Sequence, residues 1–191
     1  MKKYLNVCML SLIVATAFLF TACNNNNSPK QEEVDAVKKQ LDELLTEKEL
    51  TGDYLVKFDT LDFVVFSNQE WIRFHESHDQ NIKVHWPDGH FTVGIDKHIE
   101  DMKAMFVYAP DTQIKEHPIK FGSGKFTAVT GIMEGTFTKP MPIGNGKFIQ
   151  PTGKSFKIPM CTIGIWENGV MVEEHLFWDN QTYMKQLGVI N

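Results

Sequence analysis

The stretch from Trp166 to Gly188, WENGVMVEEHLFWDNQTYMKQLG, contains a turn signal, an alternating strand pattern and a short helix in immediate succession. Read with a period of two, one face of the strand carries Val170, Val172, Glu174, Leu176 and Trp178, and the other carries Met171, Glu173, His175, Phe177 and Asp179. Charged groups set among aromatic residues are unusual in a plain core strand. We therefore expect this segment to form the wall of a pocket.

His175 and Asp179 fall on the same face of the predicted strand, which makes them candidate catalytic residues. An imidazole and a carboxylate inside an apolar surround suit general acid/base chemistry, because desolvation and mutual charge move both pKa values toward neutrality. We expect a raised pKa for Asp179 beside Trp178 and Phe177, with His175 holding or relaying its proton. The alternative is that Asp179 caps the helix that follows it.

Three helices precede a run of strands along the chain. The stretch Glu32–Leu50 carries one apolar stripe among charged residues, which predicts an amphipathic helix. Further helices are expected at 69–78 and 95–108. Short β-rich runs separated by Gly, Pro and Asn turns predict antiparallel strands at 112–122, 125–138, 146–150, 154–166 and 169–178. This order predicts an α+β fold, with the helices on one face of a curved sheet.

Several short motifs occur in an order that resembles a known family. The C-terminal segment, FVYAPD at 106–111, Gly135-Thr136 and PTGK at 151–154 together resemble the SnoaL-like polyketide cyclases and ester cyclases, a branch of the nuclear transport factor 2-like superfamily. The resemblance covers the chain from Asn68 to its end. It implies a cone-shaped fold whose curved antiparallel sheet and helices enclose a cavity. It also implies that Asp179 is the acid/base of a cofactor-free intramolecular aldol cyclisation.

The expected cavity is a natural place for a hydrophobic ligand. The segment HWPDGH at 85–90 contains a turn formed by its proline and glycine, and we expect this turn to direct side chains toward the mouth of the cavity. The alternative is that the segment is a surface loop. Where many relatives carry a histidine after Gly-Thr, this chain has a phenylalanine. The residues that we expect to contact a ligand are His85, Trp86, His117, Phe137, Trp166 and Trp178.

The first 22 residues are typical of an export signal, with Lys2 and Lys3 before an apolar run from Val7 to Phe20. The run ends in Thr-Ala-Cys, which resembles the lipobox of bacterial lipoproteins and predicts lipidation of Cys23. An uncleaved anchor or an ordinary secretory signal is the alternative. The expected organisation is a lipoprotein signal peptide at 1–22, a flexible tether at 23–30, an amphipathic helix at 31–50 and a SnoaL-like domain at 51–191.

This organisation places the protein at the bacterial cell envelope, lipid-anchored on the periplasmic side or at the cell surface. Loss of Lys2 and Lys3 with the signal moves the formal net charge from −5 to −7, and an acidic domain is a poor partner for nucleic acid. With Cys8 in the signal and Cys23 lipidated, Cys161 has no partner for a disulfide. In its apolar neighbourhood Cys161 is typical of a small buried residue rather than a nucleophile.

A metal site is the more specific alternative to an acid/base site. His85, His90, His117 and His175, with Asp179 or Glu174, could in principle supply ligands to zinc or iron. Seven histidines in 191 residues make such groupings common by coincidence, so we expect no metal and no cofactor. The chain contains no G-x-S-x-G, P-loop or Rossmann motif, which leaves serine hydrolase, nucleotide hydrolase and nicotinamide functions without support.

Three functions remain open at this point. The first is a cofactor-free cyclase, isomerase or lyase that acts on a small hydrophobic carbonyl compound by acid/base catalysis. The second is a lipoprotein that binds a small hydrophobic ligand without turnover, and the third is a structural role through the amphipathic helix. Expected partners are a small hydrophobic molecule and the membrane, and relatives are often dimeric, which leaves room for a homodimer. One fold serves all three functions in the superfamily, so the site must decide between them.

Overall fold

The computed structural model describes residues 30–191, and residues 47–191 form one compact unit that contains the cavity and the side-chain clusters described below. The helical elements are α2 (Gln31–Thr60), a π-helical turn η1 (Leu61–Phe66), a 3₁₀ helix η2 (Trp71–Glu76), α3 (Ile95–Tyr108) and α4 (Asn180–Leu187). The strands are β1 (His78–His85), β2 (Phe91–Val93), β3 (Gln113–Ile114), β4 (Lys120–Ser123), β5 (Phe126–Thr136), β6 (Met141–Pro142), β7 (Phe148–Ile149), β8 (Ser155–Glu167) and β9 (Val170–Trp178).

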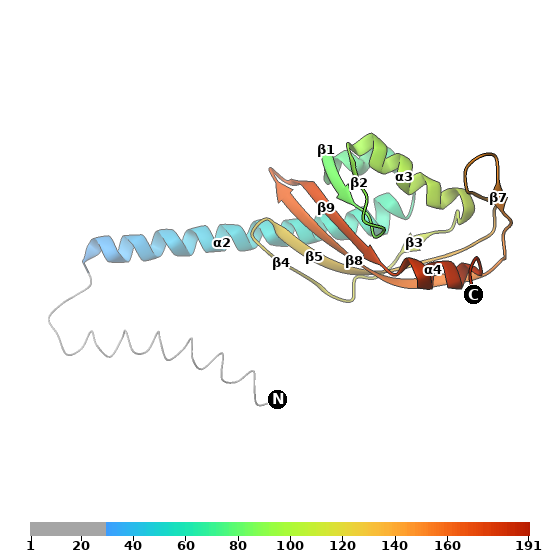
Figure 1. The fold of residues 1–191 in the computed structure, drawn as a ribbon. Coiled ribbons are helices and arrows are strands. Elements are labelled where there is room, and N and C mark those ends of the chain that lie inside the picture. The colour runs from blue at the N-terminus through green and yellow to red at the C-terminus, as the bar shows by residue number, and fades with distance from the viewer. Residues whose placement is uncertain (1–29) are drawn as a thin grey trace, which may run out of the picture. The chain divides into compact units, whose positions relative to one another are not determined.

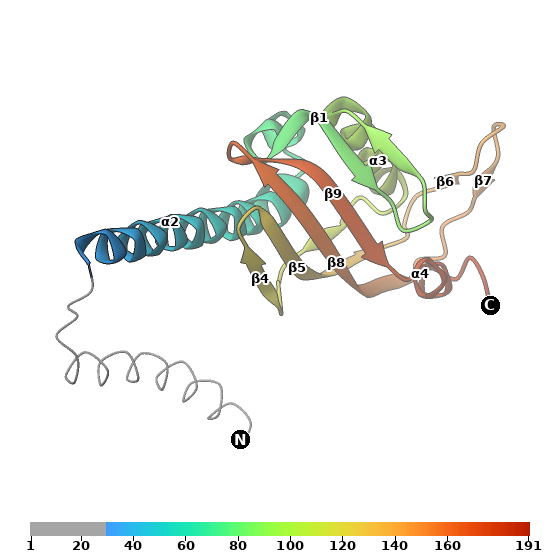
Figure 2. The same cartoon turned by 60° about the vertical axis from the view of Figure 1, so that its left-hand side comes forward.

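Seven of these strands form one curved, unclosed sheet. Its order is β2-β1-β9-β8-β5-β3, with β4 also paired to β5, and Figure 2 shows β4, β5, β8, β9 and β1 side by side. All pairs are antiparallel except β1 and β9, which run parallel. A parallel pair needs a long connection, here the whole chain from β1 to β9. The fold is the expected α+β class, with helices and a curved sheet.

The helices cover the sheet through aromatic contacts. In the last turns of α2, Tyr54 stacks on Trp166 of β8 with ring centroids 4.7 Å apart, and Phe58 meets the same indole edge-on. Helix α3 packs against β1 and β2, and Figure 1 shows it beside these strands. Helix α4 closes on β8, and the Tyr183 hydroxyl meets that of Tyr108 at 2.8 Å. These aromatic contacts place the core between the sheet and its helices.

A bulge in β9 changes the predicted faces of its first residues. The register between β8 and β9 shifts between Ile165 and Trp166, because Val172 is an extra residue in β9. The shift turns Met171 to the buried face together with Glu174, so its predicted place beside His175 was wrong. From Glu174 onward the predicted alternation is confirmed. Glu174 is 4 % exposed, whereas Glu173 points outward and is only half-buried.

Most predicted elements are present with shifted ends. Helix α3 begins and ends where the pattern predicted, and α4 follows Asp179 as expected. The amphipathic helix continues past Leu50 to Thr60 because Thr51, Tyr54 and Phe58 bury a face of its last turns. The apolar stripe of α2 is exposed at Val37, Leu41, Leu44 and Leu45. Among residues 30–191, no helix has both the length and the apolar character that crossing a membrane requires. The predicted signal peptide and Cys23 lie outside the described residues.

Candidate active-site cavity

A cavity of about 40 Å³ lies between the helices and the inner face of the sheet. Its wall is mostly apolar, with four methionines and two tryptophans among the lining side chains. The titratable residues in that wall are Asp62 of η1, His78 of β1, His98 of α3 and Glu174 of β9, and all four are buried. Four such groups from four elements, gathered in an apolar surround, make this the strongest candidate for a site.

The π-helical turn places Asp62 in the cavity wall. In η1 the Ser67 N–H donates to the Asp62 carbonyl five residues back rather than four, which widens the helix at its junction with α2. The Asp62 side chain thereby lies on the buried side of an otherwise apolar turn. Burial raises the pKa of Asp62 above the usual value of an aspartate, and the hydrogen bond from His117 opposes this effect only in part.

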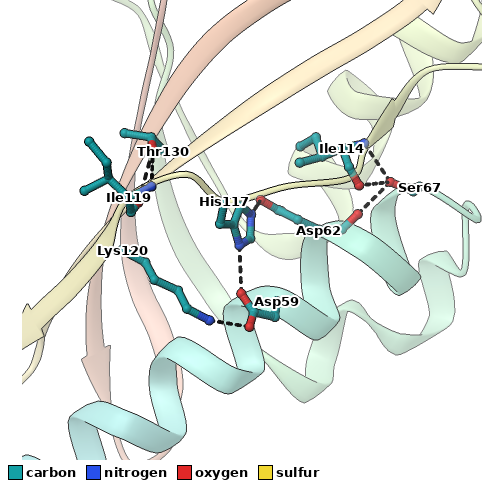
Figure 3. Close-up of polar contacts among 8 residues, drawn as sticks. All are labelled: Asp59, Asp62, Ser67, Ile114, His117, Ile119, Lys120 and Thr130. Atoms are coloured by element: carbon teal, nitrogen blue, oxygen red, sulfur yellow. Dashed lines mark hydrogen bonds and ion pairs between the residues drawn. The ribbon is translucent and has the colours of Figure 1, made fainter.

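His117 connects Asp62 to a second carboxylate nearer the surface. Its Nε2 lies 2.8 Å from Asp62 Oδ2, and its Nδ1 lies 2.8 Å from Asp59 Oδ1 (Figure 3). Asp59 is also paired with Lys120. Burial disfavours the charged imidazole, but the hydrogen bonds and charges of Asp62 and Asp59 outweigh it and raise the pKa of His117. An imidazolium donates from both nitrogens, which matches two carboxylate acceptors.

The segment that carries His117 is fixed at both ends. On one side, Ser67 Oγ accepts from the Ile114 N–H at 2.9 Å and donates to the Asp62 carbonyl at 2.7 Å. On the other side, Thr130 Oγ1 accepts from the Ile119 N–H at 2.9 Å, and all of these contacts appear in Figure 3. The loop between β3 and β4 is therefore held at each end, so His117 is positioned rather than free to swing away from Asp62.

Glu174 faces two buried imidazoles on the other side of the cavity. His98 Nε2 lies 3.2 Å from Glu174 Oε2, and His78 Nε2 lies 3.9 Å from the same oxygen. The rings of Phe74 and Trp86 pack near His98 and exclude water from the cluster. Burial lowers the pKa of His98 to about 4, so its ring is neutral near neutral pH.

A family model described as SnoaL-like polyketide cyclase matches residues 60–187, which contain Asp62, His78, His98, His117 and Glu174. The chain belongs to this SnoaL-like family. Because the match includes the cavity and its sheet but only the last residue of α2, the family domain is the part of the chain that carries the candidate site.

Solved structures share the fold of this SnoaL-like chain. A protein of Jannaschia sp. CCS1, assigned as a SnoaL-like polyketide cyclase, is 15 % identical, with a TM-score of 0.64 over 74 % of this chain and 96 % of that one. IdmH of Streptomyces antibioticus, assigned as a polyketide cyclase, is 19 % identical, with a TM-score of 0.60 over 71 % and 98 %. AclR of Streptomyces galilaeus, assigned as a hydroxylase, is 14 % identical, with a TM-score of 0.55 over 77 % and 83 %. No curated protein matches the chain. At these identities the structures establish the fold, and their assigned activities differ.

The SnoaL-like fold places Asp179 outside the cavity. It is the N-cap of α4, where its Oδ1 accepts from the Gln181 and Thr182 N–H groups and its Oδ2 accepts from the Thr182 hydroxyl at 2.6 Å. The Thr182 hydrogen bonds lower the pKa of the exposed Asp179 carboxyl, so the raised pKa that we predicted was wrong. The cause is its position, because β9 ends at Trp178 and leaves Asp179 in solvent.

His175 and His85 meet on the outer side of the sheet. The parallel register pairs them directly, and their rings stack 4.1 Å apart with an interplanar angle of 1°. Glu173 lies between them, with its Oε1 2.6 Å from His85 Nε2 and 3.3 Å from His175 Nε2. His175, Asp179 and His85 therefore do not converge on the enclosed cavity.

The other predicted ligand contacts divide into two groups. Trp86 and Trp178 line the cavity as expected, and His117 approaches it through Asp62. Trp166 and Phe137 do not line the cavity, because each is fully buried in the core elsewhere: Trp166 lies under Tyr54 and donates to Thr127 Oγ1, and Phe137 packs edge-on against Tyr108. Cys161, the free cysteine among the described residues, is half-buried, and burial raises the pKa of its thiol, as expected for an unreactive side chain.

Sequence reasoning did not identify Asp62, His78 and His98 as site residues, although signals for two of them were present. Asp62 is a lone carboxylate inside the apolar run LDFVVF, and a buried acid in such a run is rare without a role. His98 lies three residues after Ile95 and four before Met102, on the inward stripe of its helix. No local signal singled out His78, because its burial depends on η2 and α3 packing over β1.

Proposed function

We propose that the cavity is the active site of a cyclase-type enzyme that acts by acid/base catalysis on a small hydrophobic carbonyl compound. The observation that carries this proposal is the chain Asp59–His117–Asp62, which connects a carboxylate in the cavity wall to one near the surface. Asp62 is the proton acceptor in this proposal. The imidazolium of His117, held in place by Asp59, orients the Asp62 carboxylate and favours its charged form, and Asp62 returns the proton to the product. Membership of the SnoaL-like family supports a cyclase-type reaction, and the proton transfer itself requires no cofactor.

The cavity lining limits the ligand. About 40 Å³ is well below the several hundred cubic ångströms of a typical ligand pocket, so a ligand larger than a few water molecules must move side chains. Met102, Met105, Met133 and Met160 supply the unbranched, adaptable side chains that such movement requires. We infer a ligand with an apolar body and a single carbonyl group that points toward Asp62.

The test is proton abstraction beside a carbonyl. We expect the protein to accelerate hydrogen–deuterium exchange at the α-carbon of methyl ketones, from acetone to acetophenone, measured by NMR in D₂O. Asp62→Asn removes the proton acceptor and keeps the side-chain volume, so exchange should fall by at least about a hundredfold. The matched control is Asp88→Asn, an exposed aspartate in the loop after β1, which should exchange at the wild-type rate.

The same assay decides between Asp62 and the residue predicted from sequence. If Asp179→Asn abolishes exchange while Asp62→Asn leaves it intact, then Asp62 is not the proton acceptor. Wild-type protein that exchanges no ketone faster than the folded Asp62→Asn variant would contradict the enzymatic proposal as a whole.

The second candidate function is binding of a small hydrophobic ligand without turnover. The apolar, methionine-rich lining favours it, because this lining holds a ligand whether or not a proton moves. Native mass spectrometry of the protein purified from its own membranes would distinguish the two functions, since a binding protein retains an unchanged ligand.

We also propose that Cys23 carries a lipid and holds the domain at the cell envelope. The support is the sequence alone, namely the basic start, the apolar run and the cysteine that ends it. The polar tract NNNNSPK at 24–30 would then separate the folded domain from the membrane surface.

A further inference from the structure

Three buried ligand atoms from three elements converge beside the cavity. They are one ring nitrogen each of His78 and His98 and one carboxylate oxygen of Glu174, and all lie within 4.8 Å of one another. His98 Nε2 and His78 Nε2 lie 3.2 Å and 3.9 Å from Glu174 Oε2. In a tetrahedral zinc site with bonds of about 2.0–2.1 Å, neighbouring ligand atoms are about 3.3 Å apart. The observed spacing therefore suits a metal ion between the three groups.

The hydrogen bonds of His78 favour a ring that is ready to bind a metal. Its Nδ1 lies 3.3 Å from the Phe74 carbonyl and 2.9 Å from Ser77 Oγ. The Ser77 hydroxyl donates to the same Phe74 carbonyl, so its oxygen is free to accept from Nδ1. A proton on Nδ1 satisfies both contacts and leaves Nε2 with a lone pair toward Glu174. Metal-binding histidines commonly donate their other ring N–H to a backbone carbonyl in this way.

The cluster lacks hydrogen bonds that buried polar atoms normally make. Among the described residues, neither His78 Nε2 nor Glu174 Oε2 has a hydrogen-bond partner, and His98 Nδ1 is also unpaired. A lone pair that faces a carboxylate oxygen is repulsive unless a cation lies between them. An ion bound to His78, His98 and Glu174 would satisfy the first two atoms at once.

We propose that His78, His98 and Glu174 bind one divalent transition-metal ion. Two imidazoles and one carboxylate suit zinc or ferrous iron better than calcium or magnesium, which prefer oxygen ligands alone. The three side chains line the cavity, so the ion keeps an open coordination position toward it. The ion would add a Lewis acid that can polarise a ligand oxygen. The site goes beyond the acid/base function proposed above and does not depend on it.

Zinc binding tests the proposal directly. After treatment with EDTA and dialysis, the purified full chain is loaded with zinc, and bound metal is measured by inductively coupled plasma mass spectrometry. We expect one zinc per chain at the buried site and an increase in melting temperature on loading. Cobalt in place of zinc should give the visible absorption bands of a low-symmetry site with nitrogen and oxygen ligands.

The variants separate the buried cluster from the histidine pair on the outer side of the sheet. Glu174→Gln keeps the side-chain volume, His98→Gln nearly keeps it, and each removes a ligand, so zinc affinity should fall roughly a hundredfold or more, with loss of the cobalt bands. The matched control is the double variant His85→Gln with His175→Gln, which removes the surface cluster around Glu173 and should keep the bands and the thermal shift.

Three results would overturn the proposal. They are absence of zinc from the folded wild-type chain after loading, unchanged affinity in both buried variants, and loss of the cobalt bands only in the surface double variant. If a buried variant does not fold, the cobalt spectra of the wild type and of the surface double variant still show whether the metal depends on the surface cluster. Ketone exchange by the EDTA-treated protein reports on Asp62 separately, so failure of the metal site and failure of the acid/base proposal are distinguishable.

Discussion

At the scale of single residues, the surroundings of each acid decide what it can do. Asp62 and Asp179 are the same side chain in opposite conditions. Asp62 lines the cavity, and burial raises its pKa. Asp179 is exposed and caps α4, and the hydrogen bonds that it accepts from Thr182 and Gln181 lower its pKa. Only the first has a pKa moved toward neutral pH, which is the direction that a general base requires.

His117 makes a testable contribution to the pH dependence of stability. Its folded pKa lies above the ordinary 6.5, so the folded state binds more protons than the unfolded state between 6.5 and the folded value. This contribution is present below pH 6.5 and is lost as the pH rises through the folded pKa. We expect the free energy of unfolding to fall with pH in this window, by at most about 1.4 kcal/mol per pH unit.

Urea unfolding of wild type and His117→Gln between pH 6 and 9 measures this effect. The glutamine can still donate a hydrogen bond but cannot titrate, so the difference in stability between the two proteins should shrink as the pH rises. A difference that stays constant across the range would show that His117 does not change charge in the folded protein.

At the scale of elements, irregular geometry positions the site. The π turn places Asp62 inside the cavity, and the bulge at Val172 resets the faces of β9 so that Met171 and Glu174 both lie inward. Parallel pairing of β1 with β9 then sets His85 opposite His175. The π turn, the bulge and the parallel pairing each depend on contacts with a neighbouring element, so the sequence pattern of one segment does not predict them.

Helix α4 gives a direct test of the role of Asp179. Asparagine at this position still accepts the Gln181 and Thr182 N–H groups, whereas alanine leaves them without an acceptor. We expect Asp179→Asn to melt within about 1 °C of wild type and Asp179→Ala to melt about 2–4 °C lower by circular dichroism. Equal melting temperatures for the two variants would mean that the cap contributes little to α4.

At the scale of the whole molecule, the SnoaL-like domain follows an N-terminal segment. The sequence of that segment predicts export of the protein and lipidation at Cys23. The family match begins at residue 60, after most of α2. The cavity, the Asp59–His117–Asp62 chain and the proposed metal site all lie within the compact unit Glu47–Asn191. The anchor is therefore expected to affect location rather than chemistry.

Replacing Cys23 with serine tests the anchor. The variant lacks the thiol that receives the lipid, so we expect it to leave the membrane pellet and appear in the soluble fraction after cell lysis and ultracentrifugation. Ketone exchange by the released protein should equal that of the wild type. Sedimentation with membranes in the same proportion as wild type would contradict lipidation at this cysteine.

The sequence by itself determined the fold class, the family and the helix at 95–108, because these follow from local periodicity, turn signals and motif order. It left open whether Glu173 or Glu174 faces inward. It also pointed to Trp86, Trp178 and His117 near the cavity. Only the tertiary structure decided which acids are buried and which groups meet. Asp62 and His117 are 55 residues apart, and Glu174 meets His78 and His98 from three separate elements. Burial and proximity across the fold set the pKa of each group, and neither property is encoded in the spacing of nearby residues.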